Sequence, residues 1–304
     1  MSNSTPDTVS IRAHAKINLF LRVLSRESTG YHGIETVFSL LELADEISVE
    51  RTARGIDIEI DGADTGPTED NLAVRAARAM LAATGERFGV RIHLKKNIPV
   101  LAGLGGGSSD AAATLHAVNA LTGGAVPHHE VLQFAAKLGS DIPFFASGSS
   151  MALGWNRGER LFRISGPPRA PTLLVIPEVG ISTVTAYELL DRAGGYPTPR
   201  GAIVLDPDAL RTWGSIGRLG GNDFESVVWG REPRIREAFE RMAQTRPLLV
   251  RMSGSGSAIV GIYRSESDLE QAASMIGRAG WGLVQTRTRS NPAPGPVALG
   301  ATDQ

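Results

Sequence analysis

The sequence has no cysteine and no long apolar run among its 304 residues. The lack of cysteine excludes disulfides, thiolate nucleophiles and Cys-ligated zinc. No segment approaches the roughly 18 apolar residues that a membrane helix needs, and residues 1–14 lack the apolar core of a signal peptide. The six histidines do not fall in an H-E-x-x-H or similar metal-binding pattern. We therefore expect a cytoplasmic protein without membrane contact.

An excess of positive charge is also missing. Lys and Arg total 31 against 32 Asp and Glu, so the formal net charge is −1. Proteins that coat nucleic acid usually carry a net basic charge, so we expect no nucleic-acid partner. Lysine itself is scarce, because only positions 16, 95, 96 and 137 carry it. Its compact charge suits close phosphate or hydroxyl contacts, so each lysine is a candidate site residue.

Apolar periodicity divides the chain into two α+β regions. Apolar residues alternate over residues 9–23, which predicts a half-buried strand. Strands are also predicted over 46–50, 56–60, 90–95, 172–176, 248–253, 257–263 and 281–287, and helices over 71–83, 128–138, 183–193 and 267–278. The segment 164–171 is rich in Pro and Gly and is the best linker candidate. We expect domains over 1–165 and 166–289, followed by a disordered tail over 290–304.

Residues 99–108 form a glycine-rich loop that precedes a predicted helix ending near residue 121. Bare amides in such a loop, together with the positive helix N-terminus, make an anion site. Ser108 and Ser109 add hydroxyls for phosphate or Mg²⁺, and Ser109 and Asp110 are expected to cap the helix. The loop lacks the Gly-Lys-Ser/Thr of a Walker A motif and the third glycine of G-x-G-x-x-G. The alternative is a flexible turn before a capped helix.

Three motifs together resemble those of the GHMP kinases, and the resemblance covers nearly the whole chain. The loop P-x3-G-L-G-G-G-S-S-D is similar to their second motif, Ala15–Leu19 to the first, and Ser253–Ser257 to the third. The resemblance implies a two-domain α+β fold. Its N-terminal domain is similar to the second domain of ribosomal protein S5, and its C-terminal domain is ferredoxin-like. It also implies ATP and Mg²⁺ as cofactors.

Three further features narrow the resemblance to one branch of these kinases. They are Gly-Tyr-His-Gly at 30–33, the triple glycine at 105–107 and Gly-Ser-Asp-Ile-Pro-Phe at 139–144. The implied acceptor is the 2-hydroxyl of a small molecule, a cytidine diphosphate-linked methylerythritol. We expect a monomer or a weak homodimer.

The catalytic pair implied by the resemblance is Lys16 and Asp141. Asp141 is the expected base, placed at a helix break, and Lys16 is expected to orient it and to stabilise the forming alkoxide. Asn18 lies two residues from Lys16 on the same strand face, roughly 7 Å away, and can bond a substrate hydroxyl. The alternative for Asp141 is an aspartate with only a structural role in a turn. The alternative for Lys16 and Asn18 is a solvated strand face.

The remaining expected site residues divide into two sets. The ATP-binding set is Asn71, Lys96, Pro99, Gly103, Leu104, Gly105, Gly106, Gly107, Ser108 and Ser109, with Ser108 as the Mg²⁺ ligand. The substrate-binding set is Asn18, Tyr31, His32, Thr183, Tyr187, Gly254 and Ser255. Tyr31 and Tyr187 are expected to stack on cytosine and His32 to bond its edge. For three of these residues the alternative is a role without ligand binding: a helix N-cap at Asn71, a solvated strand end at Lys96 and a core position at Tyr187.

Two other functions remain open at this stage. The first is another GHMP kinase, acting on homoserine or mevalonate, for which a pair that stacks on cytidine has no use. The second is a non-enzymatic RNA-binding protein of S5-like fold, against which the net charge and the presence of Lys16 and Asp141 argue.

Overall fold

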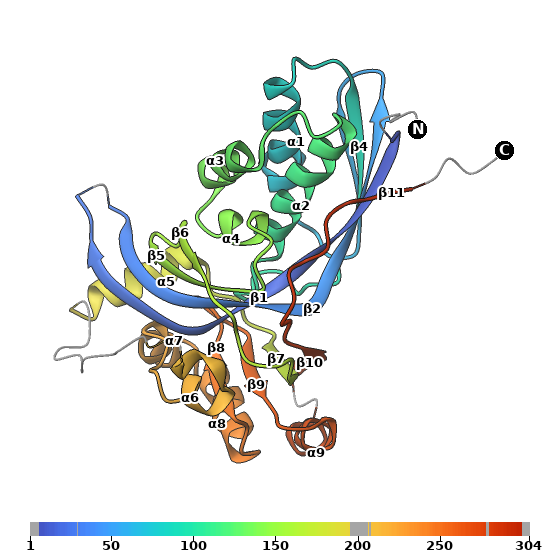
Figure 1. The fold of residues 1–304 in the computed structure, drawn as a ribbon. Coiled ribbons are helices and arrows are strands. Elements are labelled where there is room, and N and C mark those ends of the chain that lie inside the picture. Colours follow the sequence, from blue (N-terminus) through green and yellow to red (C-terminus); the bar gives the residue numbers. More distant parts are fainter. Residues whose placement is uncertain (1–5, 29, 195–205, 207, 278–279, 300–304) are drawn as a thin grey trace.

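Two β-sheets organise the computed structural model, which describes residues 6–28, 30–194, 206, 208–277 and 280–299 (Figure 1). The N-terminal sheet is built on two long antiparallel strands, β1 (Thr8–Arg26) and β2 (His32–Thr52). Its strand order is β11-β1-β2-β4-β3, and β5 pairs with β2 and then with β6. The added strands are β3 (Ile56–Asp61), β4 (Gly89–Lys95), β5 (Met151–Asn156), β6 (Arg160–Arg163) and β11 (Val297–Ala298).

Four helices pack on one face of this sheet and enclose the first hydrophobic core. They are α1 (Leu72–Ala83), α2 (Gly106–Leu121), α3 (His128–Leu138) and α4 (Ile142–Ala146), and a 3₁₀ turn, η1 (Thr68–Asp70), precedes α1. The strand predicted over 9–23 is observed as β1, but the expected half-buried alternation is not: residues 13–21 are all buried, and the register with β2 shifts between His14 and Lys16 and again between Asn18 and Phe20. Lys16 and Asn18 are buried too, because the glycine loop and the loop of residues 253–257 approach them closely.

The C-terminal half has a four-stranded antiparallel sheet of order β10-β7-β9-β8. The strands are β7 (Pro171–Pro177), β8 (Leu249–Met252), β9 (Ile259–Ile262) and β10 (Trp281–Arg287). The helices are α5 (Thr183–Arg192), α6 (Trp213–Ile216), α7 (Phe224–Arg231), α8 (Pro233–Gln244) and α9 (Glu266–Ile276), with a 3₁₀ turn, η2 (Ala209–Arg211). The succession β7-α8-β8-β9-α9-β10 is the expected ferredoxin-like order.

The two sheets are joined by a shared apolar cluster, in which β1 residues such as Ile17 and Phe20 pack with Leu174 and Val260. A further cluster lies between the second sheet and its helices. In the described part of the chain, no helix is both long and apolar enough to cross a membrane.

Two further expectations about the chain were wrong. Helix α2 begins at Gly106 rather than after Ser109, because Gly105, with φ +71°, takes the left-handed N-cap position. The tail is ordered through residue 299: β11 pairs with the β1 edge, and the amide of Leu299 bonds the carbonyl of Thr8 at 3.0 Å. Backbone pairing at a strand edge needs little from side chains, so a Pro/Gly-rich composition did not exclude it. Residues 300–304 of that prediction lie outside the described residues.

Candidate active site

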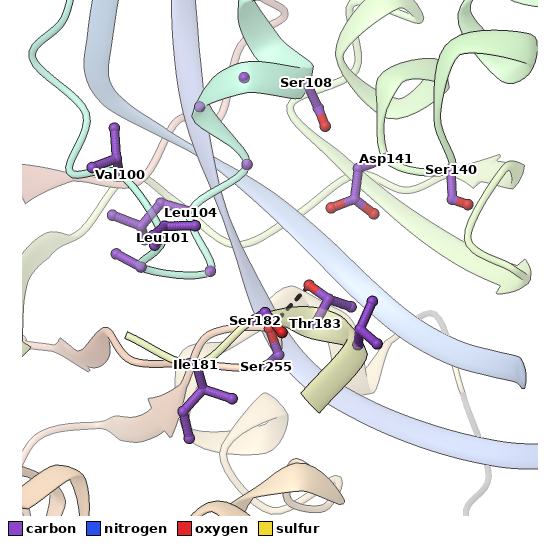
Figure 2. A pocket seen from close by; sticks show the side chains of 18 of the residues that line it. Val100, Leu101, Leu104, Ser108, Ser140, Asp141, Ile181, Ser182, Thr183 and Ser255 are labelled. Carbon is purple, nitrogen blue, oxygen red and sulfur yellow. Dashed lines mark hydrogen bonds between the residues drawn. The ribbon is translucent and has the colours of Figure 1, made fainter. Parts of the chain in front are cut away.

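A cleft of about 1170 Å³ lies between the two halves of the molecule. The glycine loop and Asp141 line it from the N-terminal half, and the start of α5 and the loop around Ser255 line it from the C-terminal half (Figure 2). Segments that are far apart in the sequence therefore meet in one cavity.

The glycine loop brings the N-terminus of α2 to the cleft. The first helical hydrogen bond of α2 is donated by the Ser109 amide to the Gly105 carbonyl at 2.9 Å. The amides of Gly106, Gly107 and Ser108 precede that bond, so they are donors that the helix itself leaves for a ligand. In Figure 2 the Ser108 side chain lies on the cleft side of the helix start. Such a helix start binds anions such as phosphate.

Residues 253–257 form a second Ser/Gly loop, which contacts the glycine loop and fixes its position. The Ser253 hydroxyl donates to the Gly103 carbonyl at 2.9 Å, and the Ala258 amide bonds the Ala102 carbonyl at 3.1 Å. A Cβ on Gly103, whose φ is +75°, would lie 2.1 Å from the Ser253 carbonyl oxygen. Only glycine fits there, so the two loops touch through their backbones.

Lys16 is at the centre of a buried polar chain. Its ammonium donates to Asn18 Oδ1 at 2.7 Å and lies 3.4 Å from Asp141 Oδ2. The Asn18 amide donates to the Thr36 hydroxyl at 2.8 Å, which in turn donates to the Phe20 carbonyl. Lys16 is only 4% exposed, whereas the Asp141 side chain is 31% exposed. These hydrogen bonds therefore fix the Lys16 ammonium, and the Asp141 carboxylate remains accessible from the cleft.

A second buried lysine, Lys96, lies behind the glycine loop between two carboxylates. It bonds Asp45 and also Asp110 Oδ2, the latter at 2.7 Å. Burial lowers the Lys96 pKa, but the two carboxylates outweigh burial and the net shift is upward. Burial raises the pKa of Asp110 to about 7, with Asp45 adding to the rise and Lys96 opposing it. The cluster is thus a compact buried charge next to Gly106, whose Cβ would lie 3.3 Å from the Lys96 ammonium.

The other end of the cleft is aromatic. The His32 and Tyr187 rings are stacked, with their centroids 4.4 Å apart. Tyr187 also packs edge to face with Phe224, and the centroids of these two rings are 4.9 Å apart. His32 Nε2 lies 2.9 Å from Asp191 Oδ1. Tyr31 is 57% exposed on the adjacent turn. This end offers flat apolar surfaces with a polar edge.

All but one of the predicted site residues line this cleft. The exception is Ser109, whose buried hydroxyl donates to the His14 carbonyl at 2.7 Å, so it faces away from the cleft. Asn71 lines the cleft and also caps α1 by accepting from the Ala73 amide at 2.9 Å. The solvated alternative for Lys96 was wrong, because its side chain is 3% exposed. Tyr187 lies half-buried against the second-domain core while lining the cleft.

Several supporting residues were missed from the sequence. The Asn222 amide donates to the carbonyls of Met252 and Gly254 at 2.9 and 2.6 Å, and Glu225 accepts from the Met252 amide. Both hold the loop of residues 253–257, and no local pattern in the sequence assigns them this role. The pairing of Asp45 with Lys96 joins residues 51 positions apart, and no local pattern signals it.

The arrangement can bind a polyphosphate and transfer a phosphoryl group. Helix-start amides stabilise phosphate charge, and the partly exposed Asp141 carboxylate beside Lys16 can take a hydroxyl proton. Fold and cleft together define a small-molecule kinase of the GHMP class. Family models agree: GHMP kinases N terminal domain matches residues 71–149, and GHMP kinases C terminal matches residues 208–281.

Relatives narrow the class further. A protein of Solibacter usitatus named 4-diphosphocytidyl-2-C-methyl-D-erythritol kinase is 37% identical, over 90% of this chain and 87% of its own. One of that name from Moorella thermoacetica is also 37% identical, over 93% and 99%. A crystal structure of 4-(cytidine 5'-diphospho)-2C-methyl-D-erythritol kinase superposes with TM-score 0.76 at 34% identity, over 92% of this chain and 98% of that one. The chain belongs to this family of GHMP kinases.

Proposed function

We propose that this protein transfers the γ-phosphoryl group of ATP to the 2-hydroxyl of 4-diphosphocytidyl-2-C-methyl-D-erythritol, giving the 2-phosphate and ADP. The names of the relatives support the substrate. The observation that carries the proposal is one continuous cleft that has a glycine loop at one end, aromatic rings at the other, and the Lys16–Asp141 pair in its lining.

In this mechanism Asp141 takes the proton of the acceptor hydroxyl. The hydroxyl oxygen forms a bond to the γ-phosphorus while the bond from that phosphorus to the β–γ bridging oxygen breaks, and ADP leaves. Lys16, held by Asn18 at 2.7 Å, supplies positive charge beside the reacting oxygen. The amides of 106–108 receive the phosphates of ATP, and the ion pair between Lys96 and Asp110 anchors the start of α2 behind them.

Mg²⁺ fits this end of the cleft without a dedicated protein cage. Mg²⁺ commonly uses one or two protein oxygens together with substrate phosphates and water. No cluster of three or more His, Cys, Asp or Glu with metal-binding geometry occurs among the residues that the structure describes. Ser108 lies at the helix start on the cleft side and would hold the ion together with the phosphates. When bound, Mg²⁺ neutralises phosphate charge.

The aromatic end would receive the cytosine. Tyr31 and Tyr187 offer ring faces, and His32 offers a ring nitrogen to the base edge. In the structure His32 is stacked on Tyr187. We therefore propose that base binding rearranges this pair, so that cytosine takes the ring face that His32 now covers. Thr183 and Ser255, joined at 3.2 Å between hydroxyls, Gly254 and Asn18 complete the acceptor side.

The experiment that tests the function is ADP release by the purified protein with Mg·ATP. The acceptor is the cytidyl compound, homoserine, mevalonate or galactose. Turnover with the cytidyl compound alone supports the proposal. Turnover with another alcohol would leave the phosphate end standing and overturn the roles of the aromatic residues.

We further propose that the protein acts in the cytoplasm as a monomer or a weak homodimer, and that it engages neither nucleic acid nor membrane. Sedimentation velocity at two protein concentrations tests the oligomeric state. Cell fractionation tests the location, and a filter-binding assay with RNA tests the expected absence of nucleic-acid binding.

A further inference from the structure

The turn between β5 and β6, residues 157–159, touches both ends of the acceptor site. A Cβ on Gly158 would lie 3.8 Å from Asp141 Oδ1 and 3.4 Å from Ile34 Cδ1, so the turn packs beside the candidate base. Its neighbour Arg157 places its guanidinium carbon 3.9 Å from the centroid of the Tyr31 ring. One short turn therefore lies between the site of phosphoryl transfer and the aromatic end.

The turn is built to hold its shape. The Glu159 carboxylate accepts from the Asn156 side-chain amide at 2.5 Å and from the Arg157 backbone amide at 2.9 Å. Asn156 has φ +65° and Gly158 has φ +107°, values that suit these two residue types. Both flanking strands belong to the N-terminal sheet, since β5 pairs with β2 and β6.

Arg157 ties this turn to the segment that carries Tyr31. Its Nη2 lies 2.6 Å from Glu27 Oε2. Glu27 closes the same segment through its backbone, because its amide bonds the Tyr31 carbonyl at 2.7 Å and its carbonyl accepts from Gly30 at 3.0 Å. The ion pair and the ring contact thus fix Arg157 to the segment at two points.

Tyr31 keeps a large open surface despite this contact. It remains 57% exposed while the Arg157 cation lies over its ring. A cation over one face of an aromatic ring is attracted by the ring quadrupole and holds the ring in place. The uncovered surface of the ring is then presented in a fixed orientation, and both residues line the cleft.

We propose that Arg157 is a positioning residue for the pyrimidine base of the acceptor. It holds Tyr31 by one ring face so that the base stacks on the other, and the rigid turn sets the separation between that base and Asp141. This inference rests on the proposed function and deepens it, because it assigns part of the acceptor specificity to a turn outside the three shared motifs.

The test compares Arg157→Ala and Arg157→Lys with Arg160→Ala, an exposed arginine of the same hairpin, as the control. For Arg157→Ala we expect the KM for the cytidyl acceptor to rise about tenfold, the size of a moderate cation–π contact. The kcat and the KM for ATP should stay near wild type. Lysine keeps the charge and loses the planar stack, so its KM should fall between the two. Arg160→Ala should match wild type.

A binding measurement separates this inference from the proposed function. Titration calorimetry with CDP, in the absence of ATP, should give a Kd about tenfold weaker for Arg157→Ala than for wild type. Unchanged CDP affinity, or a fall in kcat with unchanged KM, would overturn the role of Arg157 even if the cytidyl compound is the substrate. If wild type fails to phosphorylate that compound, the proposed function fails, while the CDP comparison still tests Arg157. Glu27→Gln, which keeps the side-chain shape, repeats the test if Arg157→Ala does not fold.

Discussion

The two ends of the cleft are built from different materials. The phosphate end consists of backbone: helix-start amides, two interlocked glycine loops and a lysine buried behind them. The base end consists of side chains on a turn and on the face of α5, among them Tyr31, His32 and Tyr187. Every nucleotide carries the same phosphate groups, which backbone amides can bind. The bases differ from one another, so side chains that contact their faces and edges are needed to recognise one of them. Substitutions should therefore separate the two ends cleanly.

The largest effect is expected between the two ends, at Asp141. Asp141→Asn removes the group that takes the hydroxyl proton, so kcat should fall about 10²- to 10⁴-fold. The KM for ATP should change little, because the carboxylate is not part of the amide cradle. Steady-state assays of ADP release at varied ATP and acceptor concentrations measure both quantities.

Asp191→Asn is the matched control for this loss. Both carboxylates line the cleft, both are 31% exposed, and each pairs with a basic group, Lys16 or His32. Asp191→Asn should raise the KM for the acceptor and leave kcat within a few-fold of wild type. Similar kcat losses in the two variants would contradict the assignment of Asp141 as the base.

The next largest effect is expected on the free energy of unfolding, and it tests the contact between the two loops at the phosphate end. Gly103→Ala forces a Cβ to within 2.1 Å of the Ser253 carbonyl oxygen at φ +75°, so either the loop or the contact must give way. We expect a loss of about 2 kcal/mol or more in the free energy of unfolding. Gly107→Ala meets only Leu72 Cδ1 at 3.8 Å within a helix, and it should be neutral or stabilising.

Urea unfolding of the two glycine variants checks this pair. Equal destabilisation by both would contradict the structure at this loop, because the added carbon is crowded and φ is positive at Gly103 but not at Gly107.

At the base end, Tyr187→Ala removes a ring that stacks on His32 and packs on Phe224. The KM for the cytidyl acceptor should rise about threefold to tenfold, in line with the strength of an aromatic pair. The KM for ATP should stay unchanged. Tyr187→Phe keeps the ring and should behave as wild type, so a rise in KM for this variant would move the role from the ring to the hydroxyl.

Most of the strongly periodic elements could be predicted from the sequence, whereas short elements whose stability comes from tertiary contacts could not. Helix α3 runs over the predicted residues 128–138, since Pro127 precedes it and Gly139 ends it. The β5–β6 hairpin and the first half of β2 were missed, and so was α8, although Ile235, Ala238 and Met242 give it a clear helical apolar stripe. The hairpin is short and contains Gly154, which packs against the Phe38 ring, so its strand pattern is weak.

The candidate site shows the same division. Local sequence patterns place the central residues: the first motif contains Lys16, the second is the glycine loop, and the segment at 139–144 contains Asp141. The residues that support them, such as Thr36 behind Asn18 and Asn222 behind the second Ser/Gly loop, contact across long stretches of chain. Ser109 shows the reverse error: its place in the motif suggested a ligand, but the helix turns its side chain inward.

The smallest expected effect is on the pH dependence of stability, and it tests whether Asp110, behind the glycine loop, is protonated in the folded protein near neutral pH. Burial raises the pKa of Asp110 to about 7, well above its ordinary value of 3.8. The folded protein therefore binds a proton more tightly than the unfolded chain between these two values. This contribution to stability is fully present below about pH 4 and is lost as the pH rises through about 7. Asp110→Asn removes the titrating group but keeps an oxygen that can accept from Lys96.

The variant should consequently lose less stability than wild type between pH 5 and pH 8, by a margin on the order of 1 kcal/mol. Urea unfolding at several pH values gives the two curves, and Asp57→Asn, at an exposed strand position, should follow wild type. Parallel curves for wild type and Asp110→Asn would mean that Lys96 keeps Asp110 ionised across this range. A flatter curve for the variant would mean that the charge behind the glycine loop changes near neutral pH. The affinity for ATP should then weaken above pH 7 in wild type more than in Asp110→Asn, while the affinity for CDP, at the other end of the cleft, should not follow this change.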